Sequence, residues 1–377
     1  MNWMRFWAVG RKEFIHVIRD PQSLITSIAI PMLLLTLFGY ALSLDVDRVP
    51  MVVWDQSRTP ASRDFIDLFK GSRYFSLQNY VDTYSRLERA IDGGTAIVGM
   101  VLPTDFSERL GAGRPVSVQL IVDGSDSNTA TIAMGYADAI VQSYSLNASV
   151  KRVERLGAHV PRPPLDFQPR VWFNEDLQSR NYIVPGLIAV IMMIIAAMLT
   201  SLTVAREWER GTMEQLLSTP VRAPELIFGK LVPYFVIGMV DVVLAVLMGQ
   251  FLFHVPLRGS VLLLFIMAAV FLAGALSLGI LISVLMKNQL LASQAAMILT
   301  YLPAFLLSGF MFAIGNMPKP LQWLSYLIPA RYFITLLKGI YLKGTGIRVL
   351  APEALLLVVF AIVMMVLANV RFKKRLE

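Results

Sequence analysis

The sequence has no cysteine and only three histidines, which excludes several kinds of chemistry. Without cysteine the chain has no disulfide, no thiolate zinc cluster and no thiol nucleophile. His16, His159 and His254 stand far apart in the sequence and lack metal-ligand spacing such as His-Glu-x-x-His. We therefore expect structural or solvated histidines and no metal site.

Nucleotide-binding and catalytic motifs are also missing. The nearest approach to a GxxxxGK[ST] phosphate loop, Gly339 to Thr345, lacks the lysine that would reach a phosphate. Neither a GxSxG nucleophile elbow nor a His-Glu-x-x-His helix occurs. We expect that the chain alone is not an enzyme, binds no cofactor and does not hydrolyse ATP.

Charged residues make up only 16% of the chain and hydrophobic residues 56%. The apolar residues form runs long enough to cross a bilayer of about 30 Å, which predicts a polytopic α-helical membrane protein. The net charge of +8 comes mainly from cations beside the ends of these runs, so we expect no nucleic-acid partner. The six predicted spans are Leu24 to Leu44, Tyr182 to Ala205, Leu226 to Phe253, Val261 to Met286, Leu290 to about Ile314, and Leu350 to Val370.

The first span, assigned to residues 23–44, is too long for a signal-peptide core and no cleavage site follows it. Residues 45–180 then change to polar, mixed sequence, which predicts an inserted α/β domain. Gly157 to Pro169 contains four prolines and is expected to be an extended connector. Within the domain we expect strands at Val49 to Trp54, Ala96 to Leu102 and Val116 to Val122, and helices at Tyr84 to Ile91 and from about Asn128 to Leu156.

Charge at the span ends predicts the orientation. The N-terminus, the loop 206–224, Lys287 and the tail Arg371 to Arg375 fall on one side if six spans alternate. The positive-inside rule makes this side cytoplasmic, so both termini are cytoplasmic and residues 45–180 are extracytoplasmic. Residues 1–22 mix aromatics with charges, as in a helix that lies in the membrane interface, although a simple topology anchor would have the same composition.

The loop 206–224 is the most distinctive stretch of the five-helix domain 181–377. Its arginines are explained by topology alone, but its three glutamates, Trp208 and the boundary residues Pro220 and Pro224 are not. A short amphipathic helix that offers charge to a soluble partner accounts for all of them. The candidate docking residues are Arg206, Glu207, Glu209, Arg210, Gly211, Thr212 and Glu214.

This loop resembles the coupling segment of type-two ABC transporter permeases. The family pattern Arg-Glu-x-x-x-Gly-Thr-x-Glu-x-Leu-x-x-x-Pro begins here at Arg206, and a Gly-Lys pair follows at Gly229 and Lys230. Further resemblance lies in RKEFIHVIRDP, FLLSGFMFAIGNMP and LSYLIPARYFITLLKGIYLKG, and it covers nearly the whole chain. In the first of these, Arg11, Lys12 and Glu13 match the family's elbow helix.

The resemblance implies several properties. An ABC ATPase subunit that uses ATP and Mg would dock on the loop 206–224, and a second permease copy or a paralogue would complete a dimer. Residues 315–346 would form extracytoplasmic re-entrant helices. The subset of the family with a large domain after the first span resembles bacterial inner-membrane multidrug exporters, often with a periplasmic adaptor.

Several residues within the spans are candidates for a transport pathway. Asp241 lies near the middle of the third span, where a carboxylate is costly unless it faces protein or water. It contacts substrate or a proton path in one interpretation, and is hydrogen-bonded at a helix interface in the other. Residues that weaken their helices could line the pathway or only allow close packing: Pro185, Gly186, Pro303, Ser308 and Gly309.

The predicted function is therefore the permease subunit of an exporter for a hydrophobic or amphipathic, drug-like compound. The alternative is a membrane-anchored receptor or scaffold whose extracytoplasmic domain binds a ligand or partner. The docking loop separates the two, because a scaffold has no use for it.

Overall fold

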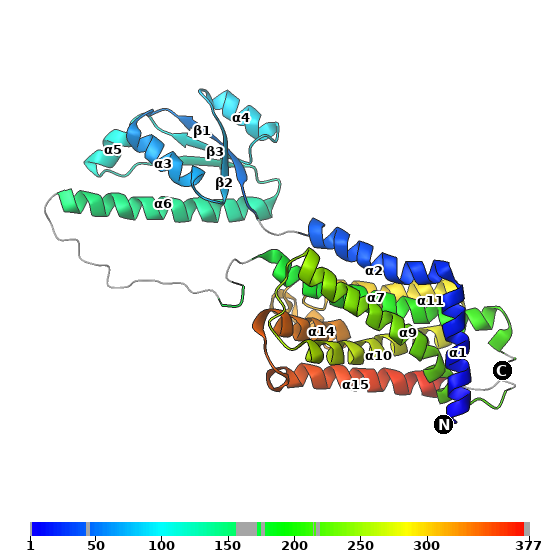
Figure 1. Cartoon of the computed structure of the whole chain (residues 1–377). Coiled ribbons are helices and arrows are strands. Elements are labelled where there is room, and N and C mark those ends of the chain that lie inside the picture. Colours follow the sequence, from blue (N-terminus) through cyan, green and yellow to red (C-terminus); the bar gives the residue numbers. More distant parts are fainter. Residues whose placement is uncertain are drawn as a thin grey trace. The chain divides into compact units, whose positions relative to one another are not determined.

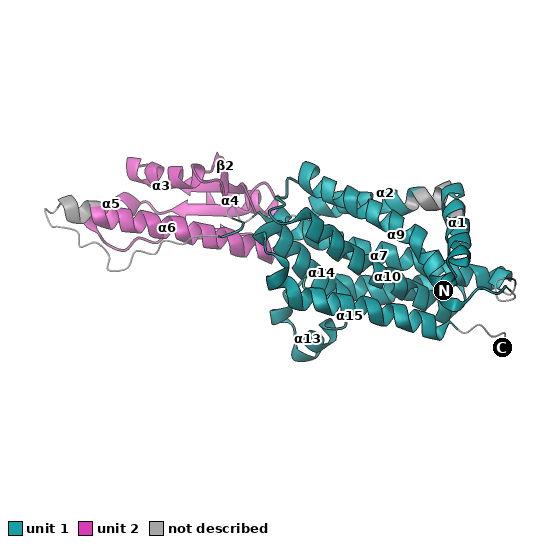
Figure 2. Cartoon of the chain, turned by 60° about the horizontal axis from the view of Figure 1, so that its bottom comes forward, with its two compact units in different colours: residues 1–43, 171–377 teal, residues 44–170 magenta. Residues whose placement is uncertain are grey.

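The computed structural model describes residues 2–42, 46–155, 172–174, 178–213, 215 and 219–372. The chain forms two compact units, shown in different colours in Figure 2. Unit 1 comprises Met1–Ser43 and Val171–Glu377, and unit 2 comprises Leu44–Arg170. The predicted connector 157–169, Glu214 and the tail beyond Phe372 lie outside the described residues.

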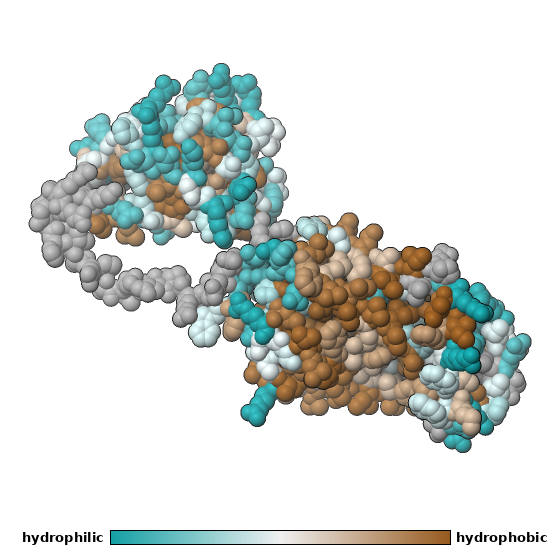
Figure 3. Space-filling view, viewed as in Figure 1, coloured by the Kyte–Doolittle hydropathy of each residue, from teal (hydrophilic) through white to brown (hydrophobic). Residues whose placement is uncertain are grey.

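Unit 1 is helical, and its long helices run side by side in Figure 1, with α1 crossing one end of them at a steep angle. Figure 3 shows a hydrophobic band over the middle of the unit and polar surface at both ends, as expected for a bilayer-facing protein. The main helices are α1 (Trp3–Arg19), α2 (Pro21–Ala41), α7 (Ser179–Glu209), α9 (Ala223–Leu247), α10 (Val261–Met286), α11 (Gln289–Ala296), α12 (Leu302–Leu306), α13 (Lys319–Ser325), α14 (Pro329–Lys338) and α15 (Ile347–Arg371).

Five described helical segments are long and apolar enough to cross a membrane, and α2 contributes a shorter apolar stretch, Ser27–Ala41. The most apolar part of α7 is 78% buried, against 22% for that of α15, so α7 is the central helix of the bundle. The five segments are Ser179–Glu209, Ala223–Leu252, Val261–Met286, Gln289–Leu306 and Ile347–Arg371.

Small residues bring α7 and α10 into close contact. A Cβ on Gly279 would lie 2.1 Å from Thr200 Oγ1 and 2.5 Å from the Ala197 carbonyl oxygen, so only glycine fits there. Thr200 Oγ1 also donates a hydrogen bond to the Leu276 carbonyl oxygen, 2.9 Å away. These polar and small groups hold the two helices together, because in lipid the burial of apolar surface between helices adds little to their association.

The segment predicted as one span from Leu290 to about Ile314 is interrupted. After α11 come a π-helical turn, Met297–Tyr301, and α12, which ends at Leu306. Pro303 lies in the first turn of α12, and Gly309 has a left-handed backbone with φ 81°. The prediction of helix beyond Leu306 is wrong: α12 ends there, and the left-handed backbone of Gly309 then turns the chain away.

The region after Gly309 folds back onto the bundle. It contains the 3-10 turn Ile314–Asn316, α13, α14 and the π-helical turn Gly339–Lys343. Phe333 of α14 stacks on Phe271 of α10, with ring centroids 4.2 Å apart. Trp323 of α13, by contrast, is 74% exposed.

Unit 2 contains a four-stranded sheet in the order β2-β1-β3-β4, in which only β4 is antiparallel to its neighbour. Side chains alternate along β1: Met51 and Val53 face a core with α3, α5 and α6, and Val52 faces α4. The elements are β1 (Val49–Asp55), α3 (Pro60–Lys70), β2 (Phe75–Tyr80), α4 (Tyr84–Asp92), β3 (Val98–Leu102), α5 (Phe106–Ala112), β4 (Gln119–Val122) and α6 (Ser127–Arg155).

Candidate functional site

Helix α1 lies directly against the start of α9. A Cβ on Gly229 would lie 2.8 Å from the Cβ of Val9, so the glycine permits the contact. Arg5 Nη1 donates to the Pro220 carbonyl oxygen at 2.5 Å, and the backbone N–H of Asn2 donates to Glu225 Oε1 at 2.5 Å. The N-terminal helix is therefore bound to the loop between α7 and α9.

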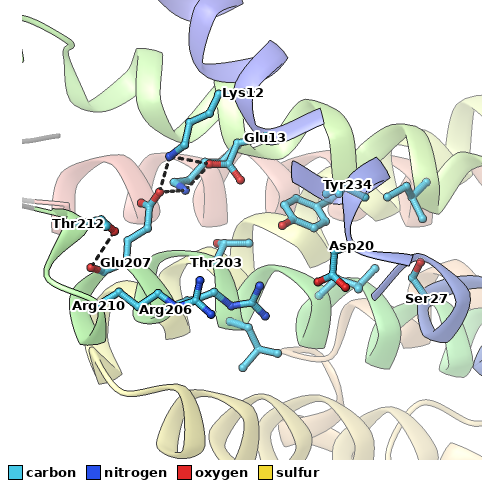
Figure 4. A pocket seen from close by; sticks show the side chains of 15 residues that line it. Lys12, Glu13, Asp20, Ser27, Thr203, Arg206, Glu207, Arg210, Thr212 and Tyr234 are labelled. Atoms are coloured by element: carbon cyan, nitrogen blue, oxygen red, sulfur yellow. Dashed lines mark hydrogen bonds and ion pairs between the residues drawn. The ribbon is translucent and has the colours of Figure 1, made fainter. Parts of the chain in front are cut away.

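Four side chains from three helices form an ion-pair cluster at this junction: Lys12 and Glu13 of α1, Glu207 of α7 and Lys230 of α9. Lys230 Nζ lies 2.9 Å from both Glu13 Oε1 and Glu207 Oε1. Lys12 Nζ lies 3.1 Å from Glu207 Oε1 and 3.6 Å from Glu13 Oε1. Figure 4 shows Lys12, Glu13 and Glu207 turned toward one another. Two cations and two carboxylates balance the charge of the cluster.

The cluster is mostly buried. The side chains of Lys230, Glu13 and Glu207 are 2%, 6% and 11% exposed, whereas that of Lys12 is 56% exposed. Burial alone would lower the pKa of Lys12, but the charges of Glu207 and Glu13 outweigh it and raise this pKa above its ordinary value. Removing one partner from such a buried group typically costs about 3–5 kcal/mol, because a charge stays behind without its counter-charge.

A cavity of about 250 Å³ lies beside the cluster. The side chains of Arg206, Arg210 and Tyr234 line it together with the cluster residues (Figure 4). Thr212 also lines it and donates from Oγ1 to the Glu207 carbonyl oxygen at 3.3 Å. The opening between α1 and the end of α7 therefore carries charge of both signs, on a lining that also includes apolar side chains such as Leu199 and Ile237.

The start of the loop 206–224 is tied to α11. Gln289 donates from its backbone N–H to Glu209 Oε1 at 2.8 Å and from Nε2 to Glu209 Oε2 at 2.5 Å. Arg206 Nε donates to Gln289 Oε1 at 3.3 Å. Helix α7 ends at Glu209, and Gly211 has a left-handed φ of 68°, which turns the chain away. Arg210, Gly211 and Thr212 are exposed.

The structure thus brings together residues that the sequence presents as two separate groups. Lys12 and Glu13, predicted as part of the elbow helix, meet Glu207, predicted as a docking residue, while Arg11 is exposed outside the cluster. Lys230 completes the site; the sequence marked it only as part of the family's Gly-Lys pair. The available signal was a cation in an apolar span, which requires a counter-charge.

The candidate pathway residues fall into two places. Asp241 is 1% exposed, and neither of its carboxylate oxygens has a hydrogen-bond partner among the described residues. The others gather at the start of α7, where Tyr182 Oη donates to the Gly309 carbonyl oxygen at 2.9 Å. There, Gly186 contacts the Phe310 ring so closely that a Cβ on the glycine would lie 2.4 Å from the ring. Pro185 precedes Gly186 in α7, and Pro303 lies in α12. The Ser308 hydroxyl donates a hydrogen bond to the Ala304 carbonyl oxygen.

In the described part of the chain, no three His, Cys, Asp or Glu side chains gather in a way that could hold a metal ion. The site instead consists of charge pairs between helices, beside an exposed loop, at one end of an apolar bundle. This arrangement places paired charges and an exposed loop at one end of a bundle whose helices are long and apolar enough to cross a membrane.

The family model of the ABC-2 family transporter protein matches residues 21–370, and the chain belongs to this family. The chain is 38% identical to the probable multidrug ABC transporter permease YbhS of Escherichia coli K12, over 100% of this chain and 99% of that protein. It is 30% identical to the probable multidrug ABC transporter permease YbhR of the same organism, over 92% of each chain. A third relative, the inner membrane transport permease YhhJ, is 25% identical over 91% of this chain and 92% of that protein.

Membership confirms the resemblance seen in the coupling segment. The chain is a multi-pass membrane permease subunit of an ABC transporter, a transport subunit rather than a catalyst, in a family whose members work with an ABC ATPase.

Proposed function

We propose that the chain is the permease subunit of an ATP-driven exporter in a bacterial inner membrane. It moves a hydrophobic or amphipathic, drug-like compound out of the cytoplasm or the inner leaflet, while a separate ATPase binds ATP and Mg and docks on the loop 206–224. The ion-pair cluster is the observation that supports this most strongly, because it joins α1, α7 and α9 directly beside the loop.

The loop and the cluster have different tasks in this proposal. The exposed residues Arg210, Gly211 and Thr212, with Glu214 after them, form the docking surface. Glu207 is buried and paired within the chain, so it passes on the motion of the loop instead of contacting the ATPase itself. When the ATPase moves the loop, α7 and α9 follow as rigid elements because Lys230 and Glu207 hold them to each other and to α1.

The proposed topology has six spans, with α2 as the first, cytoplasmic termini and a periplasmic domain at 45–180. The segment 315–346 then lies on the periplasmic side as re-entrant helices. Lys338 Nζ supports this placement because it lies 3.4 Å from the centroid of the Tyr182 ring, at the start of α7 and opposite the end that carries Glu207. A second permease copy or a paralogue completes the transport pathway. Asp241 and the residues near Gly309 contribute to this pathway. A periplasmic adaptor is a further partner.

The test is affinity purification of the full chain in mild detergent, mass spectrometry of the proteins that accompany it and an ATPase assay of the eluate. We expect a stoichiometric ABC ATPase, and we expect Arg210→Glu to remove it. Lys319→Glu is the matched control, because Lys319 is also exposed but lies in the segment proposed to be periplasmic. An eluate without ATPase, carrying only ligands of the outer domain, would favour the receptor or scaffold.

A further inference from the structure

Unit 2 contains a half-open cavity of about 810 Å³, bounded by α3, α5, β4 and α6. Small-molecule sites in proteins commonly measure about 300–1,000 Å³, and about 150 Å³ is enough for benzene. No residue of this cavity belongs to the ion-pair cluster, which lies in unit 1. The cavity therefore needs an explanation of its own.

Aromatic rings form the inner wall. The Phe65 ring lies 5.6 Å from that of Phe106 and 5.0 Å from that of Tyr144, measured between centroids. Phe65 and Phe106 are each 2% exposed, so their positions are fixed by the surrounding core. A rigid aromatic wall binds flat or branched apolar groups with little loss of side-chain freedom.

The wall contributed by α6 includes apolar side chains that are incompletely covered. Ala137 packs against the sheet and is 4% exposed, while Met134 and Val141 line the cavity and remain 48% and 39% exposed. Apolar surface of this kind in a cavity is favourable to cover, at about 25 cal/mol per Å² removed from water. The described residues of unit 2 leave this surface available to a ligand.

The rim carries a free cation. The left-handed φ of Gly113, 66°, turns the chain after α5 and places Arg114 at the cavity, where its side chain is exposed and makes no hydrogen bond or ion pair with any described residue. Asp138 also lines the cavity, but its Oδ2 accepts a hydrogen bond from Gln142 Nε2 at 2.7 Å. A guanidinium recognises carboxylate and sulfonate groups through paired N–H donors.

We propose that this cavity binds an amphipathic organic anion. Its apolar body packs on Met134, Val141 and Tyr144, in front of the buried rings of Phe65 and Phe106, and its carboxylate or sulfonate pairs with Arg114. The inference does not rest on the proposed export function, because binding requires neither the ATPase nor transport.

The experiment uses the full chain in lipid nanodiscs without an ATPase. The probe is a biphenyl carboxylate with a diazirine, and mass spectrometry identifies the labelled peptides after irradiation. We expect labelling within residues 106–120 and 134–149. Ala148→Trp fills the cavity and should lower this labelling about tenfold. Ala139→Trp is the matched control, because Ala139 is exposed on the same helix and does not line the cavity.

A second variant tests the charge and does not depend on how well Ala148→Trp folds. Arg114→Gln should lower labelling by the carboxylate several-fold and leave labelling by a trimethylammonium analogue of the same body unchanged. Labelling confined to the membrane spans would overturn the proposal. So would equal labelling of the wild type and a folded Ala148→Trp variant, or an Arg114→Gln variant that labels like the wild type with both probes.

Discussion

Replacing Lys230 with methionine removes the cation that pairs with both carboxylates of the ion-pair cluster. Lys230 Nζ lies 2.9 Å from Glu13 Oε1 and from Glu207 Oε1, and its side chain is 2% exposed. Methionine fills similar space but removes the buried cation that faces two mostly buried carboxylates. We expect the variant to lose about 3–5 kcal/mol of stability, the usual cost of breaking a buried pair.

The assay is thermal unfolding of the purified full chain in nanodiscs, compared at one pH and salt concentration. Lys287→Met is the control at the same end of the bundle: Lys287 is exposed and lies 5.0 Å from the Trp208 ring centroid. Its loss should cost no more than about 1 kcal/mol. Adding Glu207→Gln to Lys230→Met should restore part of the stability, since one uncompensated charge disappears. Equal unfolding temperatures for wild type and Lys230→Met would refute the reasoning.

Three further predictions address other parts of the chain. Gly279→Val should prevent the close packing of α7 on α10, because the valine Cβ would lie 2.1 Å from Thr200 Oγ1. Size-exclusion chromatography should then show loss of folded protein. An elution profile like that of the wild type would contradict the contact. The pKa of Lys12 is raised in the folded protein, so its ion pairs stabilise the fold fully at pH values below the pKa of the unfolded chain, and this stabilisation is lost as pH rises through the higher pKa of the folded state. Unfolding measured against pH should show a loss of stability at alkaline pH that the Lys12→Gln variant lacks. Identical pH profiles for the two proteins would contradict this prediction. Asp241→Asn should leave stability unchanged or raised, because no described group is bonded to the carboxylate, and should lower export in vesicles; a large loss of stability would indicate a partner.

The sequence predicted the membrane-spanning part well because long apolar runs carry their own signal. The predicted third span, Leu226 to Phe253, compares with Ala223–Leu252 in the structure. The end of the helix at Leu306 was not predicted, since the residues after it stay apolar, although Pro303, Ser308 and Gly309 were named as residues that weaken their helices. Apolar composition predicts depth in the membrane but not continuity of the helix.

In unit 2 the strands β1, β3 and β4 were recognised and the edge strand β2 was not. The predicted strand Val49 to Trp54 matches β1, which is buried on both faces. β2 was missed: apolar and polar residues alternate only over Phe75 to Gln78, which is a short signal, and burial falls from Phe75 toward an exposed Tyr80. The short helix α5 was missed as well, because seven residues give too few turns for a periodic pattern.

The ion-pair cluster could not be predicted from sequence alone. Its members Glu13 and Lys230 are separated by 217 positions, and no local pattern indicates which of many charges will meet. The sequence marked Glu207 as a charge for a soluble partner, while the structure places it in contact with Lys12 and Lys230. A buried charge pair depends on the packing of three helices, which only the folded chain defines.

In the proposed function, the ion-pair cluster carries motion from the docked ATPase to the spans. The most direct measurement is the amount of compound exported per ATP hydrolysed, in proteoliposomes that contain the permease and its ATPase. For a folded Lys230→Met variant, we predict that the ATPase still binds and hydrolyses ATP but that export per ATP falls sharply. Unchanged export per ATP in that variant would contradict the account.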